Sequence, residues 1–312
     1  MHQPILFDLR GGALGDEICA EPCIRYVLNM AIKYDIAVLC KYPDVFSHLN
    51  IPVFTKDEEI NFEKVFTVNA SPYMSFEGKM SVHPFSHYVQ PLLSHAADFS
   101  SFFLLKRSLS DEEKRPVVKF DKDSLIKVKN LVPQIEKTIG IHIGATEKCR
   151  AFTKSYAQNL VDSLCKKGYS VAIFGRKTEY MPEVSCTLNL VDKLDIPMLF
   201  AFISKAPLII TNDSAPVHIS AAFDNYLIVL PTIRHPDRLL HIRNKSKYYK
   251  AFALYKKLML DDSKIPLETT LLGWDWSEAE DHIEDYLPDI KEIESIVEKI
   301  KNKKRGLLND KL

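Results

Sequence analysis

Three short segments carry the residue types that bind phosphates and move protons. They are residues 10–17 (RGGALGDE), 144–152 (GATEKCRAF) and 211–218 (TNDSAPVH). Glycines in a turn let a ligand approach the backbone, and a nearby carboxylate can act as a general base. Cations and helix N-termini bind anions. The three segments together predict a site for an anionic ligand with a proton-accepting carboxylate beside it.

In the first segment, Asp16 lies where a helix is expected to begin. It is predicted to be a general base facing a cleft, and the alternative is a capping carboxylate that accepts backbone N–H groups. Glu17 is interpreted as a first-turn acid that suits the helix dipole. Gly11, Gly12 and Gly15 are expected to support the loop.

This glycine turn differs from a dinucleotide-binding fingerprint. That fingerprint requires glycine where Arg10 stands, and an acid after the second strand, where the chain has Cys40 and Lys41. The differences argue against a nicotinamide cofactor.

The second segment places Lys148 and Arg150 in a loop between a strand and a helix, after a turn at Gly144. A guanidinium can grip two phosphate oxygens and an ammonium supplies a point charge. These cations are predicted to bind a diphosphate. The alternative is that they are solvated loop charges.

The third segment begins a helix, since Pro216 suits a first helical turn. The N–H groups of Ser214, Ala215 and Val217 are predicted to bind an anion at the positive helix end. Asp213 either orients this loop or caps the helix. A packed or supporting role is favoured for His218 over catalysis.

Apolar runs of strand length alternate with helical patterns along the chain, which favours the α/β class with parallel sheets. Strands are expected at 4–9, 36–39, 51–54, 65–68, 117–120, 139–143, 170–174, 208–211 and 226–230. Helices are expected at 16–34, 45–49, 84–105, 124–132, 154–168, 197–205, 216–223 and 289–303. Ligands in such folds bind beyond the carboxyl ends of the strands, where all three segments lie.

The two α/β series predict two domains and a tail. We expect a first domain at 1–133, a second at 134–287, and a C-terminal helix and tail at 288–312.

Composition excludes several classes of protein. The 312 residues carry 41 basic and 41 acidic side chains, so no net charge attracts the chain to nucleic acid or to an anionic membrane. The six cysteines form no C-x-x-C pair, which argues against a zinc site and a disulfide framework. Neither a signal peptide nor an apolar run long enough to span a bilayer is visible.

The three segments together resemble glycosyltransferase family 9, the ADP-heptose heptosyltransferases of lipopolysaccharide synthesis. The matching residues are Gly15-Asp16 with Pro22, then 141–144 (IHIG), and most specifically 212–222 (NDSAPVHISAA). The chain departs from the family pattern at Arg150, where lysine is usual, at Phe152-Thr153 for Trp-Pro, and at Ser214-Ala215 for Thr-Gly. Segment 232–285 does not look like the family.

The resemblance implies a GT-B fold, in which two Rossmann-like doubly wound domains face each other across a cleft and a C-terminal helix packs back. It also implies that Asp16 is the catalytic base, that Arg150 and Lys148 grip the donor diphosphate, and that the loop from Asp213 to Val217 meets the donor phosphates. By a looser match, Glu179 after Gly175 holds the ribose hydroxyls.

The implied reaction is inverting, metal-independent transfer of a heptose or related sugar from a nucleotide-diphosphate donor to a saccharide or glycolipid hydroxyl. No cofactor beyond that co-substrate is expected. A cytoplasmic protein is expected, at the inner face of the membrane if it makes peripheral membrane contact. The D-x-D at 121–123 is interpreted as helix capping and turn chemistry rather than a metal site.

Acceptor contacts are expected on an aromatic segment that carries His83, His87, Tyr88 and His95, for which a half-buried helix face is the alternative. Three other functions stay open. The basic stretch 234–257 is compatible with a DNA-base (hydroxymethylated pyrimidine) glycosyltransferase. The same fold also serves nucleotide-sugar epimerases and would serve a non-catalytic nucleotide-sugar-binding protein. The oligomeric state is left open.

Overall fold

The structure is a computed structural model of the chain. It describes residues 5–29, 35–61, 66–69, 115–177, 180–223, 225–233, 235–236, 240, 250–259 and 282–309. The predicted helix at 84–105, with its histidines and Tyr88, lies outside these residues, as do Glu179 and most of the basic stretch 234–257.

The first sheet has four parallel strands in the order β3-β2-β1-β4. The strands are β1 (Ile5–Asp8), β2 (Ile36–Leu39), β3 (Val53–Phe54) and β4 (Phe66–Asn69). The helix α1 (Leu14–Leu28) follows β1 directly, as the glycine turn predicted. Two 3₁₀ turns, η1 (Pro43–Phe46) and η2 (Asp57–Glu59), follow β2 and β3.

The second sheet has six parallel strands in the order β10-β9-β8-β5-β6-β7. They are β5 (Thr138–His142), β6 (Ser170–Phe174), β7 (Leu188–Asn189), β8 (Leu208–Thr211), β9 (Tyr226–Val229) and β10 (Ala251–Ala253). Its helices are α5 (Lys154–Lys166), α6 (Ile196–Lys205), α7 (Ala215–Phe223) and α10 (Ile290–Asn309), and α4 (Lys122–Leu131) precedes it. Short 3₁₀ turns lie at Ile135–Lys137, Lys148–Arg150 and Ile283–Asp285.

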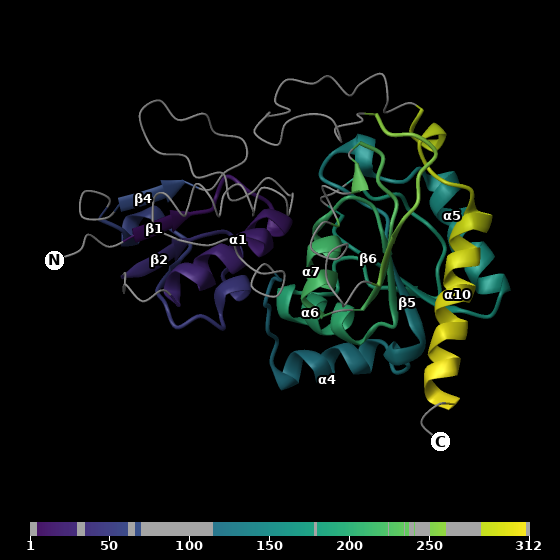
Figure 1. Ribbon diagram of the computed structural model, residues 1–312, viewed down its shortest axis with the longest axis horizontal. Coiled ribbons are helices and arrows are strands. Elements are labelled where there is room, and N and C mark those ends of the chain that lie inside the picture. Colours follow the sequence, from purple (N-terminus) through teal and green to yellow (C-terminus); the bar gives the residue numbers. More distant parts are fainter. Residues whose placement is uncertain are drawn as a thin grey trace.

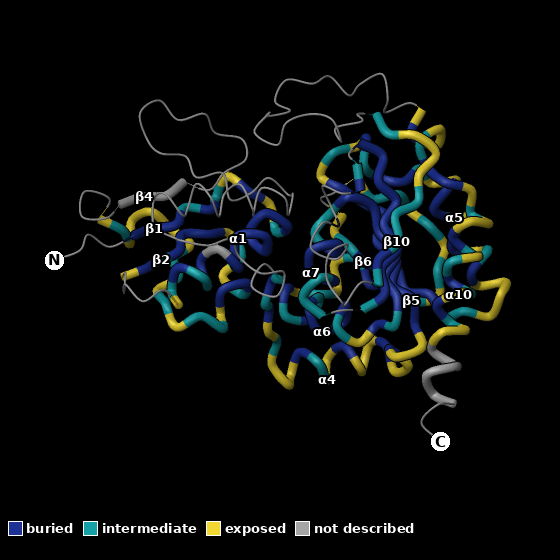
Figure 2. The backbone as a smooth tube through the Cα atoms, in the orientation of Figure 1, coloured by how far each residue is buried: buried dark blue, intermediate teal, exposed yellow. Residues whose placement is uncertain are grey.

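Helices cover both faces of the second sheet, and alternate strand residues enter different cores. Val171 and Ile173 of β6 pack with α5 and α10, whereas Ala172 and Phe174 join the cluster of α6 and α7. Figure 1 shows α6 and α7 on one side of β5 and β6, with α5 and α10 on the other. The strands between them are buried (Figure 2). This confirms the predicted α/β class with doubly covered parallel strands.

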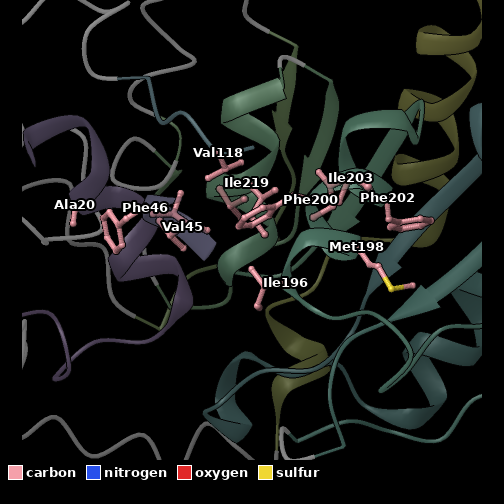
Figure 3. Packing of buried hydrophobic residues seen from close by; sticks show 14 of the residues in the cluster. Ala20, Val45, Phe46, Val118, Ile196, Met198, Phe200, Phe202, Ile203 and Ile219 are labelled. Carbon is pink, nitrogen blue, oxygen red and sulfur yellow. The ribbon is translucent and has the colours of Figure 1, made fainter. Parts of the chain in front are cut away.

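One hydrophobic cluster joins the two sheets. It contains Val45 and Phe46 of η1 together with Ile196 and Phe200 of α6 and Ile219 of α7. Figure 3 shows Val45 and Phe46 on the side of the first half, with Ile219, Phe200 and Ile196 on the helices of the second half that face them. The helices α1 and α7 pack directly on each other (Figure 1). The two halves are therefore joined by an apolar interface.

Several predicted elements are corrected. Residues 117–120 form no strand, because the Val117 N–H bonds to the Glu21 carboxylate at 2.7 Å instead of to a neighbouring strand. The expected helix at 45–49 is the 3₁₀ turn η1. The last helix continues to Asn309, beyond the predicted end at 303. The short strands β7 and β10 were not expected.

Two helix ends have identifiable caps, and the one at Asp121 confirms the predicted capping role of the D-x-D at 121–123. Gly168 follows the end of α5 with a φ of +80°, the left-handed geometry that a glycine adopts without strain. Asp121 caps α4, where its side chain accepts the Ser124 N–H at 2.6 Å. The helix α4 packs against α6 of the second sheet. The domain limits at 133 and 287 stay a prediction.

Candidate active site

The β1–α1 turn folds Asp16 back onto its own helix start. Ala13 is the N-cap residue, and Asp16 stands three residues later, where its Oδ2 accepts the Ala13 N–H at 2.6 Å. The side chain is buried, with a residue exposure of 3%. A Cβ at Gly12 would lie 2.6 Å from the Asp16 Cβ, so only glycine fits there. In the structure Asp16 thus makes a capping contact, from the third helical position rather than from the N-cap.

The residue after it, Glu17, is fully buried and has a structural role that its first-turn position did not reveal. Its carboxylate accepts the N–H groups of Lys41 at 2.8 Å and Tyr42 at 3.1 Å. Burial raises the pKa of Glu17 to about 7, although these two hydrogen bonds favour the ionised form. The Lys41 Nζ donates to the Gly12 carbonyl at 3.1 Å. Residues after β2 therefore brace the glycine turn.

Arg10 is paired with two acidic residues. It bonds to both carboxylate oxygens of Asp8 and forms an ion pair with Asp57. These acids raise the pKa of the Arg10 guanidinium above its already high value. The residue that breaks the dinucleotide fingerprint is thus part of a local charge cluster.

On the second sheet, Asn212 fixes the loop after β5. Its Nδ2 donates to the carbonyls of Gly144 and Arg150, both at 2.7 Å, and Thr232 donates to the Cys149 carbonyl at 2.8 Å. The Asn212 Oδ1 lies 3.3 Å from His142 Nδ1. The loop that carries Lys148 and Arg150 is therefore tied to the ends of β5, β8 and β9. Lys148 is exposed on this loop.

The guanidinium of Arg150 lies against the loop that begins α7. It donates to the Asp213 carbonyl at 3.0 Å and to the Thr146 hydroxyl at 2.8 Å, and it pairs with Glu147 at 3.0 Å. The Asp213 carboxylate lies 4.0 Å from the same guanidinium, and Asp213 is buried with 5% exposure. Arg150 thus compensates an acid that would otherwise repel a phosphate.

The start of α7 is shaped by side-chain hydrogen bonds. The Ser214 hydroxyl lies 3.0 Å from that of Thr211 and 3.1 Å from His142 Nδ1, and the Val217 N–H bonds to the Ser214 carbonyl at 3.0 Å. Pro216 and Val217 are buried, while Ser214 and Ala215 are half-buried. The second and third predicted segments therefore form one surface.

Helix packing brings the first segment to the same place. A Cβ at Gly15 would lie 3.5 Å from the Cα of Ala215 and 3.1 Å from the His218 ring. The turn that carries Asp16 is thus in contact with the first turn of α7. The Cys19 Sγ lies 3.3 Å from His218 Nδ1 across this interface.

Gly175, predicted to lie near the ribose, has a φ of +142° at the end of β6. A Cβ there would lie 2.2 Å from the Met181 side chain and 3.2 Å from the His142 ring. Glu179 lies outside the described residues, so its predicted role stays a prediction. Gly11 is exposed in the turn between β1 and α1, and its predicted support of this loop stays a prediction.

Other contacts between the halves were not foreseen. The Arg176 guanidinium lies 5.8 Å from the centroid of the Tyr42 ring. Arg115 donates to the carbonyls of Ala221 and Ala222 at the end of α7, and its own carbonyl accepts from Arg25 of α1 at 2.7 Å. No periodicity signals these pairs, because they depend on how distant segments pack.

The model of glycosyltransferase family 9 (heptosyltransferase) matches residues 69–259, more than half of the chain. The chain belongs to glycosyltransferase family 9. Membership makes it a glycosyltransferase and confirms the family resemblance. The match includes the second and third segments but not residues 10–17, and it extends over residues 232–259, which were expected to depart from the family.

Solved family 9 structures share its fold. A family 9 glycosyltransferase from Veillonella parvula has a TM-score of 0.62 and 13% identity, covering 96% of this chain and 98% of that one. The glycosyltransferase TibC from enterotoxigenic E. coli, described as iron-containing and dodecameric, has a TM-score of 0.62 and 14% identity, covering 96% and 77%. The E. coli ADP-heptose lipopolysaccharide heptosyltransferase II has a TM-score of 0.52 and 14% identity, and the match covers 81% of this chain and 90% of that one.

These similarities confirm the GT-B fold of the family 9 chain. Among proteins with curated descriptions, none matches it significantly in sequence. Within the described part of the chain, no helix is long and apolar enough to cross a membrane. The same residues contain no cluster of three or more His, Cys, Asp and Glu arranged to hold a metal ion.

Proposed function

We propose that this family 9 enzyme transfers a heptose or related sugar from a nucleotide-diphosphate donor to a saccharide or glycolipid hydroxyl, with inversion and without a metal ion. The observation that carries the proposal is the contact between two helix starts. Gly15, next to Asp16, meets Ala215 at the start of α7, and Arg150 bonds to the Asp213 carbonyl in the loop before it. A base and an anion-binding loop are thereby adjacent.

The donor diphosphate is assigned to the second half. The N-terminus of α7 carries partial positive charge, and Arg150 and Lys148 add two cations beside it. Charge develops on the diphosphate as the sugar leaves, so these groups stabilise the transition state more than the ground state. The Asp213 carboxylate is buried 4.0 Å from the Arg150 guanidinium, so part of the Arg150 charge offsets this acid.

The proton is assigned to Asp16. As the acceptor oxygen attacks the anomeric carbon, the bond to the diphosphate oxygen breaks and the acceptor proton passes to the carboxylate. In the structure this carboxylate already accepts the Ala13 N–H at 2.6 Å, which fixes its position beside the turn. General-base catalysis of this kind contributes about 10²–10⁴-fold.

The relatives support a heptosyl donor. One of the solved structures is TibC in complex with ADP-D-beta-D-heptose, which has a TM-score of 0.61 to this chain. Another is named for lipopolysaccharide heptose transfer. We therefore propose lipopolysaccharide or a related surface glycan as the pathway, with a glycolipid acceptor at the cytoplasmic face of the membrane.

The test combines binding and turnover. A panel of nucleotide-diphosphate sugars that includes ADP-heptose is added in EDTA, and the shift of Tm is measured for the parent chain, Arg150→Ala and Asp16→Asn. We expect stabilisation by one nucleotide class, since binding at 100 times Kd stabilises by about 2.7 kcal/mol. Arg150→Ala is expected to lose this shift, and Asp16→Asn to keep it.

Turnover with a saccharide acceptor then separates the roles. Asp16→Asn is expected to lower kcat by at least about a hundredfold. Asp123→Asn, which removes an exposed first-turn acid of α4, and Lys127→Ala on the same helix serve as controls and are expected to leave Tm shift and kcat unchanged. Absence of stabilisation by every nucleotide sugar, or an unchanged kcat in Asp16→Asn, overturns the proposal. Donor binding without turnover, unchanged in Asp16→Asn, would point to a binding protein.

A further inference from the structure

One side-chain contact between α1 and α7 pairs a thiol with an imidazole. Cys19 Sγ and His218 Nδ1 are 3.3 Å apart, although the residues are separated by 199 positions in the sequence. Both residues are buried, with exposures of 7% and 6%. The contact lies one helical turn beyond Gly15 and Asp16, so it belongs to the same face of α1 that meets α7.

Both edges of the His218 ring lie close to α1. A Cβ at Gly15 would lie 3.1 Å from His218 Cδ2 and 3.6 Å from Nε2, while Nδ1 lies against Cys19. Because Gly15 and Cys19 are four residues apart, they lie on the same face of α1, with the His218 ring against both of them. Turning the ring over would place a carbon opposite the sulfur and lose the hydrogen bond.

This contact allows two proton arrangements: the thiol donates to Nδ1, or an Nδ1–H donates to the sulfur. A neutral imidazole has one donor and one acceptor nitrogen, and a thiol is a weak donor. Transfer of the thiol proton to the ring would place two charges in a buried interface, where desolvation opposes them. We propose that Cys19 is a positioning residue: its thiol donates to Nδ1 and holds His218 as the neutral tautomer protonated on Nε2, with that nitrogen beside the first turn of α1.

The consequence for catalysis rests on the proposed function. The Nε2–H becomes a fixed hydrogen-bond donor at the junction between the turn that carries Asp16 and the anion-binding start of α7. Without the thiol, the imidazole divides between two tautomers and two orientations. A smaller fraction of molecules then has the Nε2–H hydrogen-bond donor of His218 in this position.

The first test reads the tautomer directly and needs no substrate. The full chain is labelled with ¹⁵N-histidine, and His218→Gln identifies the His218 signals. We expect one protonated and one unprotonated nitrogen, assigned to Nε2 and Nδ1. Cys19→Ser, which keeps a donor, is expected to retain this pattern, and Cys19→Val, which removes it, to give averaged or exchanged shifts.

Three results overturn the inference. One is an unchanged His218 spectrum in Cys19→Val, and another is a parent ring protonated on Nδ1 instead of Nε2. The third is a parent spectrum with both nitrogens protonated at neutral pH, as in a thiolate–imidazolium pair. Cys165→Val, at an exposed cysteine of α5, is the control and is expected to leave the His218 signals unchanged. If Cys19→Val does not fold, Cys19→Ala removes the donor without adding a branched side chain.

The second test measures transfer. A neutral hydrogen bond that fixes a donor is expected to alter kcat/KM about fivefold, so Cys19→Val should fall by that factor and Cys19→Ser should stay within about twofold of the parent. An equal loss in both variants would indicate a packing role and overturn the positioning role. If the parent chain transfers no sugar, the proposed function fails, while the tautomer is still decided by the ¹⁵N spectrum.

Discussion

The guanidinium of Arg176 lies over the ring of Tyr42, with its Cζ 5.8 Å from the ring centroid. Tyr42 follows β2 of the first sheet and Arg176 follows β6 of the second. The pair therefore joins the carboxyl ends of strands from both halves, near the edge where family 9 chemistry is proposed. It adds a polar contact to the apolar interface of α1, α6 and α7.

A double-mutant cycle measures this pair. Removing the ring in Tyr42→Leu and the charge in Arg176→Met is expected to give a coupling of about 0.5–1 kcal/mol in the free energy of unfolding, the range for partly exposed cation–π pairs. The pair of Lys257 and Tyr286, at 4.5 Å, is a matched reference within the second half. A coupling indistinguishable from zero would mean that the Tyr42 pair does not join the halves.

Glu17 makes the stability of the chain depend on pH. Its pKa is raised from the ordinary 4.5 to about 7 in the folded state, mainly by burial. The folded state therefore binds more protons than the unfolded state between these values, and the stabilising effect present below pH 4.5 is lost as pH rises through about 7. The loss is on the order of 3 kcal/mol.

The measurement is urea unfolding between pH 5 and 8 for the parent chain and Glu17→Gln. We expect the stability difference between them to move in favour of Glu17→Gln as pH rises, because an amide does not ionise. Glu58→Gln, at an exposed acid of η2, is the control. Parallel curves for parent and Glu17→Gln would show that Glu17 does not titrate in this range.

Gly12 gives a way to disturb Asp16 without changing its chemistry. A Cβ in Gly12→Ala would lie 2.6 Å from the Asp16 Cβ, so the side chain or the turn must shift. We expect kcat to fall more than tenfold, since small displacements of a catalytic group are costly, with the Kd for the donor nearly unchanged. Equal loss of donor affinity and kcat would place Gly12 in the donor site instead.

Gly175 and Gly168 allow the cost of a positive φ to be separated from the cost of a steric clash. Both have positive φ, but a Cβ at Gly168 meets nothing within 4 Å, whereas one at Gly175 would lie 2.2 Å from Met181 and 3.2 Å from His142. Gly168→Ala is expected to cost about 1 kcal/mol from conformation alone. Gly175→Ala should cost more, and it should weaken donor binding through His142. Calorimetry and donor titration on both variants test the difference.

Local patterns predicted much of this fold because its strands are short apolar runs that end in glycine or polar turns. The turns after β1, β5 and β8 were placed correctly, since Gly12, Gly144 and Pro216 mark them. The sheets have more strands than expected because β7 and β10 are too short to give a periodic signal.

The burial of polar side chains could not be predicted from the sequence. Glu17 and Glu21 sit on a helix face that looks solvated by charge, yet both are fully buried and accept backbone N–H groups from distant segments. The strand predicted at 117–120 is absent because the Val117 N–H is bonded to the buried Glu21 carboxylate. The pair of Cys19 and His218 depends on tertiary packing, which no local spacing encodes.

The apolar cluster that joins Phe46, Ile196 and Ile219 has a consequence for how the chain unfolds. Since the same core residues support both sheets, neither half can lose its packing without exposing apolar surface of the other. The two Rossmann-like halves should therefore melt in a single cooperative transition. A nucleotide held only by the second half would then protect backbone amides of α1 from hydrogen exchange as well.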